Sequence, residues 1–590
     1  MKQYIYVILF MMSVMSSCDS TSTRDVSTVE EVMDKVVIRL YSTLSPEQLD
    51  TLGSAWILSN LSPREKLVLS TRYWYFQVNT PVTVSLMRDM DQVNAPFWLE
   101  ESGFVKTDMM VRNMHSNYEV WQKDFSSGWV DLGINGFDKH RPVYFISVGP
   151  QDPDDQLEIT HIFPEDQLLD TLRAGAFTYH DWDELILEEV PDQLTGQVLF
   201  TTIRGRAREA HLMGAFRTTS YPSGIQPDQI MLSWSGDPST SMDIQWRTNT
   251  SVADGLVNYW VSGTVDTLRA VAKLKPMEDR LLQNDRYVHR FTAHLDQLQA
   301  GTPYSYQVGS EQGAWSETAS FQTEASGGDG FSFIWFGDTH KSKLWGDLIQ
   351  NSFQKFPDVA FYSVAGDLVS TGLNRDDWDQ LFHVSGPVFQ YKPLMPVPGN
   401  HDSQDGLGAW MYQEIFSLPE NGPVEVLPEL SYAFNYKNAL FLMLDVTTPL
   451  ELQSGWIEEQ LSKSEAKWKF AMFHFPPYNY EEDYSEIRKE WCTLFDTYHV
   501  DMVMSGHTHY YMRTKPIFNE EVVEHLSQGT VYVISVGIPG NHENMPVEEY
   551  AEVRDGKGWL YQHMEISGDR LIYKSLDIEG NINDTFSIEK

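Results

Sequence analysis

The chain has 590 residues, of which 42 % are hydrophobic, and it carries a formal net charge of −40. This length and composition provide core material for about three or four domains. The acidic residues are scattered along the sequence, which is typical of a solvated surface. Because a docked nucleic acid requires a basic surface, the charge argues against nucleic acid as a partner.

Residues 1–17 have the pattern of a bacterial lipoprotein signal peptide. A lysine precedes an apolar segment at residues 4–14, which is too short for a membrane-spanning helix. We expect cleavage before Cys18, lipidation of Cys18 and a polar linker over residues 18–28. The lipid would anchor the protein to a membrane of the bacterial cell envelope, on the periplasmic side or at the cell surface. Met15 is less typical of a lipobox, so a soluble secreted protein is the alternative.

The second cysteine of the chain is Cys492. If Cys18 is lipidated, no disulfide can form within the chain, and stability must come from burial of the core. The neighbours of Cys492 predict a buried position on an amphipathic helix, which is not the environment of a reactive thiol.

Residues 29–220 carry no motif of a known family, and we leave this α+β region unassigned. Their first part has the pattern of helices: an apolar stripe at Val29, Met33, Val36, Val37 and Leu40, and two Ser-Pro capping boxes at Ser45 and Ser62. Apolar and aromatic runs between residues 73 and 148 predict strands. The aromatic side chains suit a hydrophobic core, and a carbohydrate- or partner-binding surface is the alternative.

Residues 164–212 return to a helical and mixed pattern. Within them Arg204, Arg206 and Arg208 alternate along the sequence. This alternation predicts an exposed charged strand, with contact to a bound phosphate group as the alternative.

Residues 226–325 contain short alternating runs, among them PDQIMLSW, MDIQWRT and RYVHRFTAHL. Glycine, proline, asparagine and aspartate separate the runs. This pattern predicts a small all-β antiparallel sandwich.

Residues 330–590 carry five short blocks rich in metal-binding side chains: GDTH, GDLV, GNHD, FHFPP and GHTH. Most of them follow apolar runs that predict buried strands, and α/β sheets place their sites just past such strand ends. A spacing of two residues on extended backbone can direct both side chains of a block to one point. Because imidazole and carboxylate suit Zn, Fe and Mn, the blocks predict an α/β domain that binds metal ions.

The order of these blocks resembles the calcineurin-like metallophosphoesterase superfamily, whose catalytic domain is a two-sheet α/β sandwich with flanking helices. The resemblance implies one metal ion held by Asp338, His340, Asp367 and His509, and a second held by Asp367, Asn400, His474 and His507. It also implies that His401 contacts the substrate as a general acid, and that Asp402 orients His401 or favours its charged form.

The predicted sandwich at 226–325 is similar to the fibronectin type III-like domain that precedes the catalytic domain in purple acid phosphatases. The segment 298–308, with its Gly-Thr and two tyrosines, carries this likeness. Two positions depart from that family, which has Gly in place of His340 and a Tyr ligand in place of Ser370. We therefore expect no coloured ferric phenolate site. His340 takes over the missing ligand position, and Fe, Zn and Mn all remain candidates for the two ions.

The resemblance predicts hydrolysis of a small phosphoester by a metal-bound hydroxide, with His401 as the general acid. Phosphatase-like action on monoesters is the main expectation, and a phosphodiesterase or nucleotide-hydrolysing enzyme is the alternative. A hypothesis from another class is a surface binding lipoprotein whose phosphoesterase domain is secondary.

Two further segments bear on the predicted site. Residues 478–483 are acidic, which is unexpected beside a phosphate. They either favour substrates with a large neutral leaving group or fold away from the site. Residues 540–543 repeat the Gly-Asn-His-acid pattern but follow the last block, so we interpret them as loop structure near the site.

Overall fold

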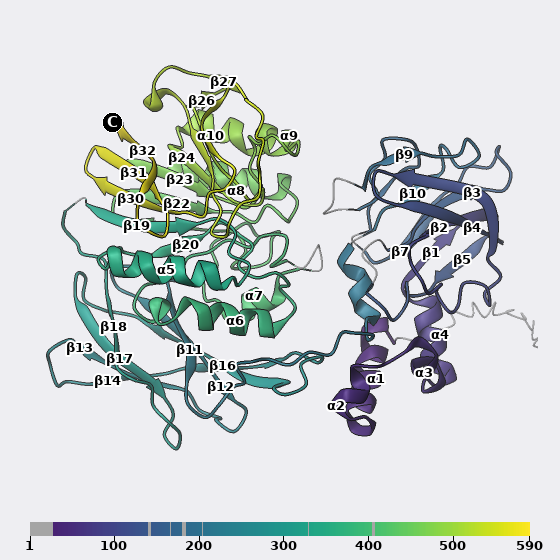
Figure 1. The fold of residues 1–590 in the computed structure, drawn as a ribbon, viewed down its shortest axis with the longest axis horizontal. Coiled ribbons are helices and arrows are strands. Elements are labelled where there is room, and N and C mark those ends of the chain that lie inside the picture. The colour runs from purple at the N-terminus through teal and green to yellow at the C-terminus, as the bar shows by residue number, and fades with distance from the viewer. Residues whose placement is uncertain are drawn as a thin grey trace, which may run out of the picture.

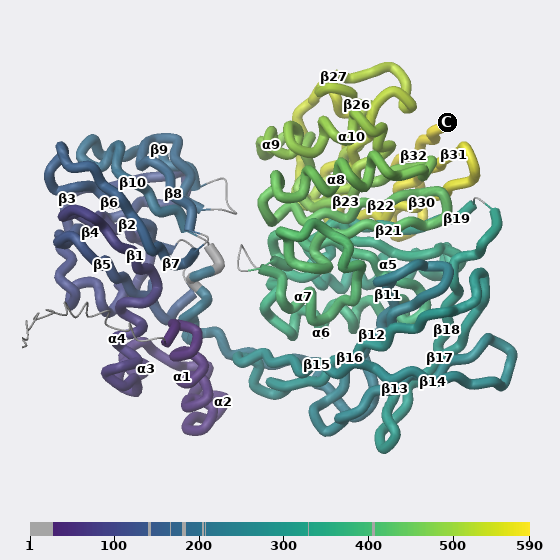
Figure 2. Tube along the Cα trace, turned by 180° about the vertical axis from the view of Figure 1, so that it is seen from behind, coloured from purple at the N-terminus to yellow at the C-terminus, as the bar shows by residue number. Residues whose placement is uncertain are grey.

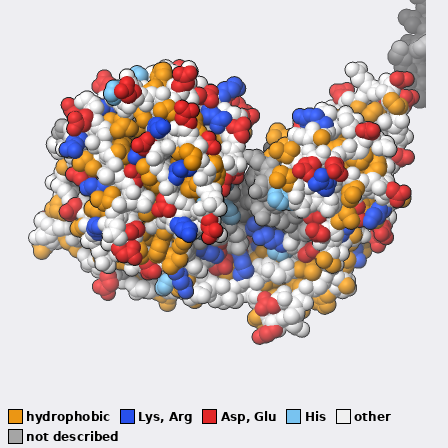
Figure 3. Space-filling view, turned by 45° about the horizontal axis from the view of Figure 1, so that its top comes forward, with side chains coloured by type: hydrophobic (Ala, Val, Ile, Leu, Met, Phe, Trp, Pro, Cys, Tyr) orange, Lys and Arg blue, Asp and Glu red, His pale blue; other side chains and the backbone are white. Residues whose placement is uncertain are grey.

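A computed structural model of the chain describes residues 27–139, 143–165, 167–179, 185–202, 204–328, 330–403 and 408–590. The predicted signal peptide (1–17), Cys18 and all but the end of the linker (18–28) lie outside these described residues. The elements α1 to β10 form one body and β11 to β32 form another (Figures 1 and 2). A space-filling view shows a hollow between the two bodies (Figure 3). Within the described part of the chain, no helix is both long enough and apolar enough to cross a membrane.

The first body combines short helices with antiparallel sheets. Its strands pair in the orders β5-β1-β7 and β8-β10-β6-β2-β4-β3-β9. The elements are α1 (Val29–Thr43), α2 (Pro46–Leu49), α3 (Ser54–Ser59), α4 (Pro63–Thr71), β1 (Trp74–Val78), β2 (Val82–Asp89), β3 (Val105–Asn113), β4 (Asn117–Phe125), β5 (Gly128–Leu132), β6 (Phe145–Pro150), β7 (Ile159–Phe163), β8 (Leu169–Thr171), β9 (Leu187–Glu189) and β10 (Val198–Phe200).

Several local predictions for this body are confirmed. The apolar stripe of α1 is buried, and Ser45 and Ser62 form capping boxes with Gln48 and Glu65. Most of the aromatic side chains belong to the core, as the full burial of Trp74 and Trp98 illustrates. Strand β3 has no apolar run of its own, because its side chains are mostly exposed or half-buried.

The prediction for the alternating arginines is wrong. Residues 204–210 form a 3₁₀ helix, η2 (Arg204–Ala210), and residues 164–212 otherwise contribute strands β8 to β10. Arg206 is buried: its guanidinium lies 3.9 Å from the ring centre of Tyr73 and donates to the Tyr73 carbonyl at 2.6 Å. Its charge is compensated by Glu209, whose Oε1 lies 2.8 Å from Nε, and by the cation–π contact. Periodicity alone could not predict this burial.

The second body begins with the β-sandwich that the alternating runs predict. Its two sheets have the strand orders β11-β12-β16-β15 and β14-β13-β17-β18, with all pairs antiparallel. Their strands are β11 (Asp228–Ser233), β12 (Met242–Asn249), β13 (Leu256–Val261), β14 (Leu268–Val271), β15 (Lys273–Glu278), β16 (Tyr287–Leu295), β17 (Pro303–Gly309) and β18 (Ala319–Gln322). Trp246 and Phe291 stack in the core, with ring centres 5.3 Å apart.

Two further sheets build the α/β part, in the orders β20-β19-β30-β31-β32 and β21-β22-β23-β24-β28-β25-β29. Pairs β22·β23, β23·β24 and β24·β28 are parallel. The elements are β19 (Phe331–Phe336), α5 (Lys343–Lys355), β20 (Tyr362–Val364), α6 (Arg375–Ser385), η3 (Val388–Gln390), α7 (Trp410–Ile415), β21 (Tyr432–Tyr436), β22 (Ala439–Met443), α8 (Glu451–Lys463), β23 (Trp468–Met472), α9 (Ser485–Ile487), η4 (Arg488–Cys492), α10 (Thr493–Tyr498), β24 (Met502–Ser505), β25 (Tyr511–Thr514), β26 (Ile517–Phe518), β27 (Glu521–Val522), η5 (Leu526–Gln528), β28 (Val531–Ile534), β29 (Ala551–Asp555), β30 (Tyr561–Ser567), β31 (Arg570–Leu576) and β32 (Ile582–Glu589).

These two sheets pack face to face through aromatic side chains. Phe333 of β19 lies 5.2 Å from Phe441 of β22 and 6.0 Å from Phe470 of β23, measured between ring centres. Helices α8 and α10 pack on the outer face of the second sheet, where Cys492 is buried as predicted. The strands that carry the metal-binding blocks are thereby fixed on a rigid two-layer core.

A buried ionic network joins the sandwich to the α/β part. Arg247 of β12 donates to Asp379 of α6 at 2.6 Å, and both side chains are 1 % exposed. It also donates to both carboxylate oxygens of Asp228, at 2.8 and 2.6 Å. Because buried charges must be paired, this network fixes the position of the sandwich relative to α6.

We predict that Arg247→Ala lowers the free energy of unfolding by about 3–5 kcal/mol, because Asp379 loses its main buried partner. Urea denaturation of the full chain measures the loss of unfolding free energy. Arg269→Ala is the matched control, since its partner Glu311 is 64 % exposed, and it should cost about 0–1 kcal/mol. Equal effects of the two substitutions would contradict the role of the network.

A second prediction concerns His563 of β30, which stacks on Phe356 with ring centres 4.0 Å apart. Burial, followed by the charge of Lys574, lowers the pKa of His563 from 6.5 to about 4. The unfolded chain therefore binds this proton more readily, and the free energy of unfolding falls as the pH drops from about 6.5 to about 4. His563→Phe should remove up to about 3 kcal/mol of this pH dependence. Denaturation across that range checks it, and a wild-type slope in the His563→Phe protein would contradict the prediction.

Candidate metal centre

The predicted ligands come together at one edge, where strands of both sheets end. Asp338 follows β19, Asp367 follows β20, His474 follows β23 and His507 follows β24. A bridge between Asp338 and Val536 connects the two sheets at this edge. The clustering past strand ends agrees with the expectation from the sequence.

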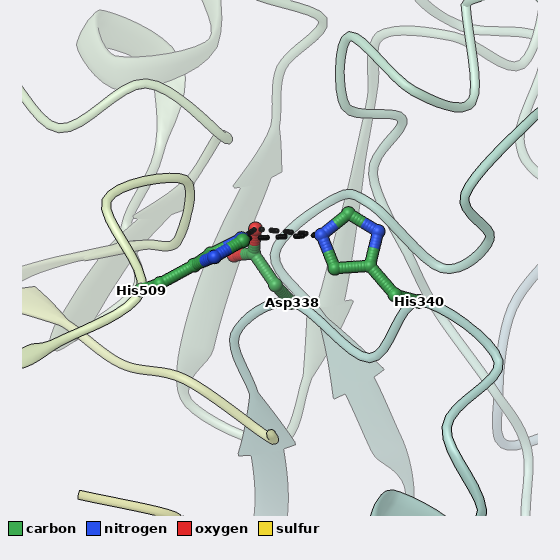
Figure 4. A group of neighbouring side chains, drawn as sticks. All are labelled: Asp338, His340 and His509. Carbon is green, nitrogen blue, oxygen red and sulfur yellow. Dashed lines mark hydrogen bonds and ion pairs between the residues drawn. The ribbon is translucent and has the colours of Figure 1, made fainter. Parts of the chain in front are cut away.

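One group consists of Asp338, His340 and His509, whose side chains converge in Figure 4. The Nε2 atom of His509 lies 2.9 Å from Oδ2 of Asp338 and 3.1 Å from Nε2 of His340. Two imidazole nitrogens this close repel through their lone pairs unless a proton or a cation lies between them. This group therefore has the donor arrangement of a cation site.

A second group consists of Asp367, His474 and His507. Nε2 of His474 lies 3.3 Å from Oδ2 of Asp367 and 3.1 Å from Oδ1 of Asn400. Asp367 also faces the first group, since its Oδ2 lies 3.7 Å from Nε2 of His340. The structure thus brings together all the side chains that the sequence predicts as ligands, with Asp367 between the two groups.

The backbone around these ligands is strained. His340, Asp367, His507 and His509 all have positive φ, between 44° and 76°. Such values are uncommon for residues other than glycine and concentrate at functional sites. His340, His507 and His509 therefore lie on left-handed backbone, and not on the extended backbone that their two-residue spacing predicts. The folded core must impose these values.

Glycines precede several ligands because there is no room for a side chain. A Cβ at Gly399 would lie 2.2 Å from Oδ1 of Asp367, and one at Gly506 would lie 2.3 Å from Oδ1 of Asp338. The glycines of the GNHD and GHTH blocks therefore allow backbone to approach the carboxylates closely. Both carboxylates use this proximity: backbone N–H groups of His401 and His507 donate to them at 2.9 and 2.6 Å.

The electrostatics of the cluster favour bound positive charge. Burial alone would raise the pKa of Asp367, but the charges of His474 and His401 outweigh it and hold the pKa well below 3.8. Burial lowers the pKa of His474, yet Asp367 and Asp338 outweigh that effect and raise the pKa to about 10. The buried carboxylates therefore require cations beside them.

His401 lies at the open side of the cluster, with 38 % of its side chain exposed. Its Nδ1 lies 2.7 Å from the carbonyl oxygen of Ser370, so Nδ1–H donates there. Its Nε2 lies 4.0 Å from Oδ2 of Asp367. This orientation leaves Nε2 facing the cluster, where a substrate would lie. The Ser370 side chain points elsewhere, with Oγ 3.4 Å from the carbonyl oxygen of His340.

The predicted role of Asp402 needs correction. Its buried carboxylate accepts hydrogen bonds from the backbone N–H groups of Leu368, Val369 and Gly399, at 3.0 to 3.1 Å. It therefore fixes the loops that carry Asp367 and Asn400, while the Ser370 carbonyl orients His401. Burial, and then the charge of Asp367, raise the pKa of Asp402 to about 7. A backbone carbonyl leaves no signature in a sequence, so this arrangement could not be predicted.

The acidic loop does not fold away from the cluster. Oε2 of Glu482 lies 3.4 Å from Nε2 of His507. Beside it, Glu481 lies 3.2 Å from Nδ1 of His542, which also contacts the Tyr480 hydroxyl at 2.9 Å. The repeat at 540–543 is thus a loop near the site, as predicted. The acidic run was visible in the sequence, but its contact with a predicted ligand was not.

The donor set fits a pair of transition-metal ions. Imidazoles, carboxylates and one amide oxygen suit Zn, Fe and Mn. His340 supplies an imidazole nitrogen to the first group. The donors therefore fit two ions in a nitrogen-rich site.

Family models match two successive parts of the chain. Residues 227–323 match the purple acid phosphatase N-terminal domain, and residues 331–511 match the calcineurin-like phosphoesterases. Human acid phosphatase type 7 is 28 % identical over 339 residues, which cover 50 % of this chain and 72 % of that protein. An uncharacterized Mycobacterium tuberculosis protein is 26 % identical over 339 residues, covering 50 % of this chain and 64 % of its own length.

The fold is also similar to a solved structure. A purple acid phosphatase from yellow lupin seeds superposes with a TM-score of 0.54 at 13 % identity, covering 88 % of this chain and 94 % of the lupin chain. The block order, the paired donor groups and the preceding sandwich agree with both family models. The chain therefore carries a calcineurin-like phosphoesterase domain at residues 331–511, preceded by a domain of the purple acid phosphatase N-terminal type at residues 227–323.

Proposed function

We propose that this protein hydrolyses small phosphoesters with the help of two metal ions, and that its action is phosphatase-like. The observation that carries the proposal is the position of Asp367 between two groups of imidazole and carboxylate donors. A carboxylate with two such neighbours can bridge two cations. The match to the calcineurin-like phosphoesterases supports metal-dependent phosphoester hydrolysis as the reaction class. The choice of small phosphoesters as substrates is proposed here.

The first group would hold one ion through Asp338, His340, Asp367 and His509, and the second would hold another through Asp367, Asn400, His474 and His507. Bound there, the ions would bind phosphoryl oxygens, stabilise developing negative charge and activate water. Fe, Zn and Mn all fit the donors. The protein contributes rigid placement, because strand ends and strained loops hold these side chains before substrate arrives.

His401 would act as the general acid. Its Nδ1–H is engaged by the Ser370 carbonyl at 2.7 Å, so Nε2 is the nitrogen available to the leaving oxygen. The protonated ring can then pass the Nε2 proton to the departing alkoxide. Asp402 would contribute indirectly, by fixing the loop on which His401 and Asn400 lie.

Monoesters are the favoured substrate class. The acid phosphatase among the relatives supports this choice. The negative charge of Glu482, which lies close to His507, would repel the second negative charge of a phosphomonoester. Diesters or nucleotides are therefore the alternative. The net charge of −40 supports a small substrate over a nucleic acid polymer.

Lipid anchoring at Cys18 in the bacterial envelope is also part of the proposal, and the lipobox-like sequence supports it. The body formed by residues 29–220 would then lie between the anchor and the catalytic part. A surface binding lipoprotein with a secondary phosphoesterase domain is the competing hypothesis. The likeness of the sandwich to fibronectin type III domains rests on its sequence pattern.

We predict that Asp367→Asn abolishes the binding of at least one ion and lowers hydrolysis by about 10³-fold, because bound ions supply several kcal/mol of transition-state stabilisation. Metal analysis and cleavage of p-nitrophenyl phosphate measure the two effects. Asp445→Asn is the matched control, since Asp445 is also fully buried but lies outside the donor groups. Unchanged turnover of a folded Asp367→Asn protein would favour the binding-lipoprotein hypothesis.

We predict that His401→Ala leaves the metal content unchanged and lowers cleavage of an alkyl phosphate by roughly 10²- to 10⁴-fold. Cleavage of p-nitrophenyl phosphate should fall much less, because its leaving group needs no proton. Comparing kcat for the two substrates checks the assignment. An equal fall for both substrates would show that His401 does not act as the acid.

A further inference from the structure

The loop between β23 and α9 wraps around His507. Phe475 packs against the His507 ring with centres 4.6 Å apart, and Tyr484 lies 6.2 Å from that ring. Phe475 and Tyr484 stack on each other with centres 5.2 Å apart. Aromatic contacts therefore limit the positions that the imidazole can adopt, and Glu482 of the same loop contacts its Nε2.

The loop itself is fixed by Asn479. The Oδ1 atom of Asn479 accepts hydrogen bonds from the backbone N–H groups of Glu481 and Glu482, at 2.8 and 2.7 Å. Its Nδ2 donates to the carbonyls of Pro476 and Glu482, both at 2.9 Å. The Tyr550 hydroxyl donates to the Asn479 carbonyl at 2.8 Å. This turn sets the direction of the Glu482 side chain.

The Glu482 carboxylate contacts two side chains. Its Oε2 accepts from the hydroxyl of Tyr484 and lies 3.4 Å from Nε2 of His507. Its side chain is 32 % exposed and that of His507 is 19 % exposed, so the contact is partly shielded from water. The carboxylate thus has a defined position relative to the imidazole.

We propose that Glu482 is a positioning residue that holds His507 with Nε2–H directed at the carboxylate and Nδ1 directed at the metal ion. The proposal rests on the proposed function for the presence of that ion. An imidazole has two nitrogens, and a hydrogen bond at one selects the tautomer in which the other carries the lone pair. A carboxylate behind a histidine ligand also raises its basicity and fixes its ring orientation.

A direct ligand role for Glu482 is disfavoured by the geometry. Among the described residues, the ligand atoms of Asp367, His474 and His507 lie within 4.8 Å of one another, and Glu482 does not belong to that group. Its contact is with the imidazole of His507. The carboxylate therefore acts on the second ion through His507.

Neighbouring Glu481 provides a matched control. It has the same charge and lies on the same loop, but its carboxylate faces Nδ1 of His542 at 3.2 Å. His542 is not among the predicted ligands. An effect of general negative charge would appear in variants of both glutamates, whereas an effect on His507 would appear only at Glu482.

The test is a competitive Zn²⁺ titration of the metal-stripped full chain against a chelating dye. Glu482→Ala should raise one of the two Zn²⁺ dissociation constants by about 10- to 100-fold and leave the other within about twofold of the wild-type value. Glu482→Gln keeps an acceptor for Nε2–H and should recover part of the affinity. Glu481→Ala should bind both ions as the wild type does.

Three results would overturn the proposal. Glu482→Ala could retain both wild-type affinities, or Glu481→Ala could weaken zinc binding equally. Glu482→Gln and Glu482→Ala could also both lose one ion completely. That result would identify Glu482 as a direct ligand. Because zinc affinity is measured without substrate, absence of phosphoester hydrolysis in the wild type would count against the proposed function alone.

Discussion

The buried carboxylate of Asp367 is the group on which the arrangement of the metal centre depends. It is 2 % exposed, and an ionised carboxylate in such a position requires compensating positive charge and hydrogen bonds. The chain supplies them from distant parts of the sequence: His474, His340 and His401 surround Oδ2 at 3.3, 3.7 and 4.0 Å, and a backbone N–H reaches Oδ1. Cations held by the same donors would satisfy this requirement more fully.

The rest of the architecture serves to hold these groups in place. Aromatic packing between the two sheets fixes the strand ends, and the strained loops beyond them carry the ligands at positive φ. Asp402, buried beneath, ties two of those loops together through backbone N–H groups. The ionic network around Arg247 holds α6 against the sandwich.

Much of the site could be predicted because its chemistry is local. Four of the five blocks contain a glycine, most follow an apolar run, and each has at least one metal-binding side chain, and these features are visible in the sequence. What could not be predicted depends on backbone and on distant contacts: the Ser370 carbonyl that orients His401, the true partners of Asp402, and Glu482 behind His507. Arg206 shows the same limit in the fold, since its burial against Tyr73 depends on residues more than a hundred positions away.

The most direct measurement is a metal add-back experiment on the stripped protein. Zn²⁺ or Mn²⁺ is added in steps, and bound ions per chain and hydrolysis of p-nitrophenyl phosphate are followed together. The account predicts binding of two ions per chain, with hydrolysis rising as the second ion binds. Full hydrolysis by a protein without bound metal, or two bound ions without cleavage of any phosphoester, would contradict a dinuclear hydrolase centred on Asp367.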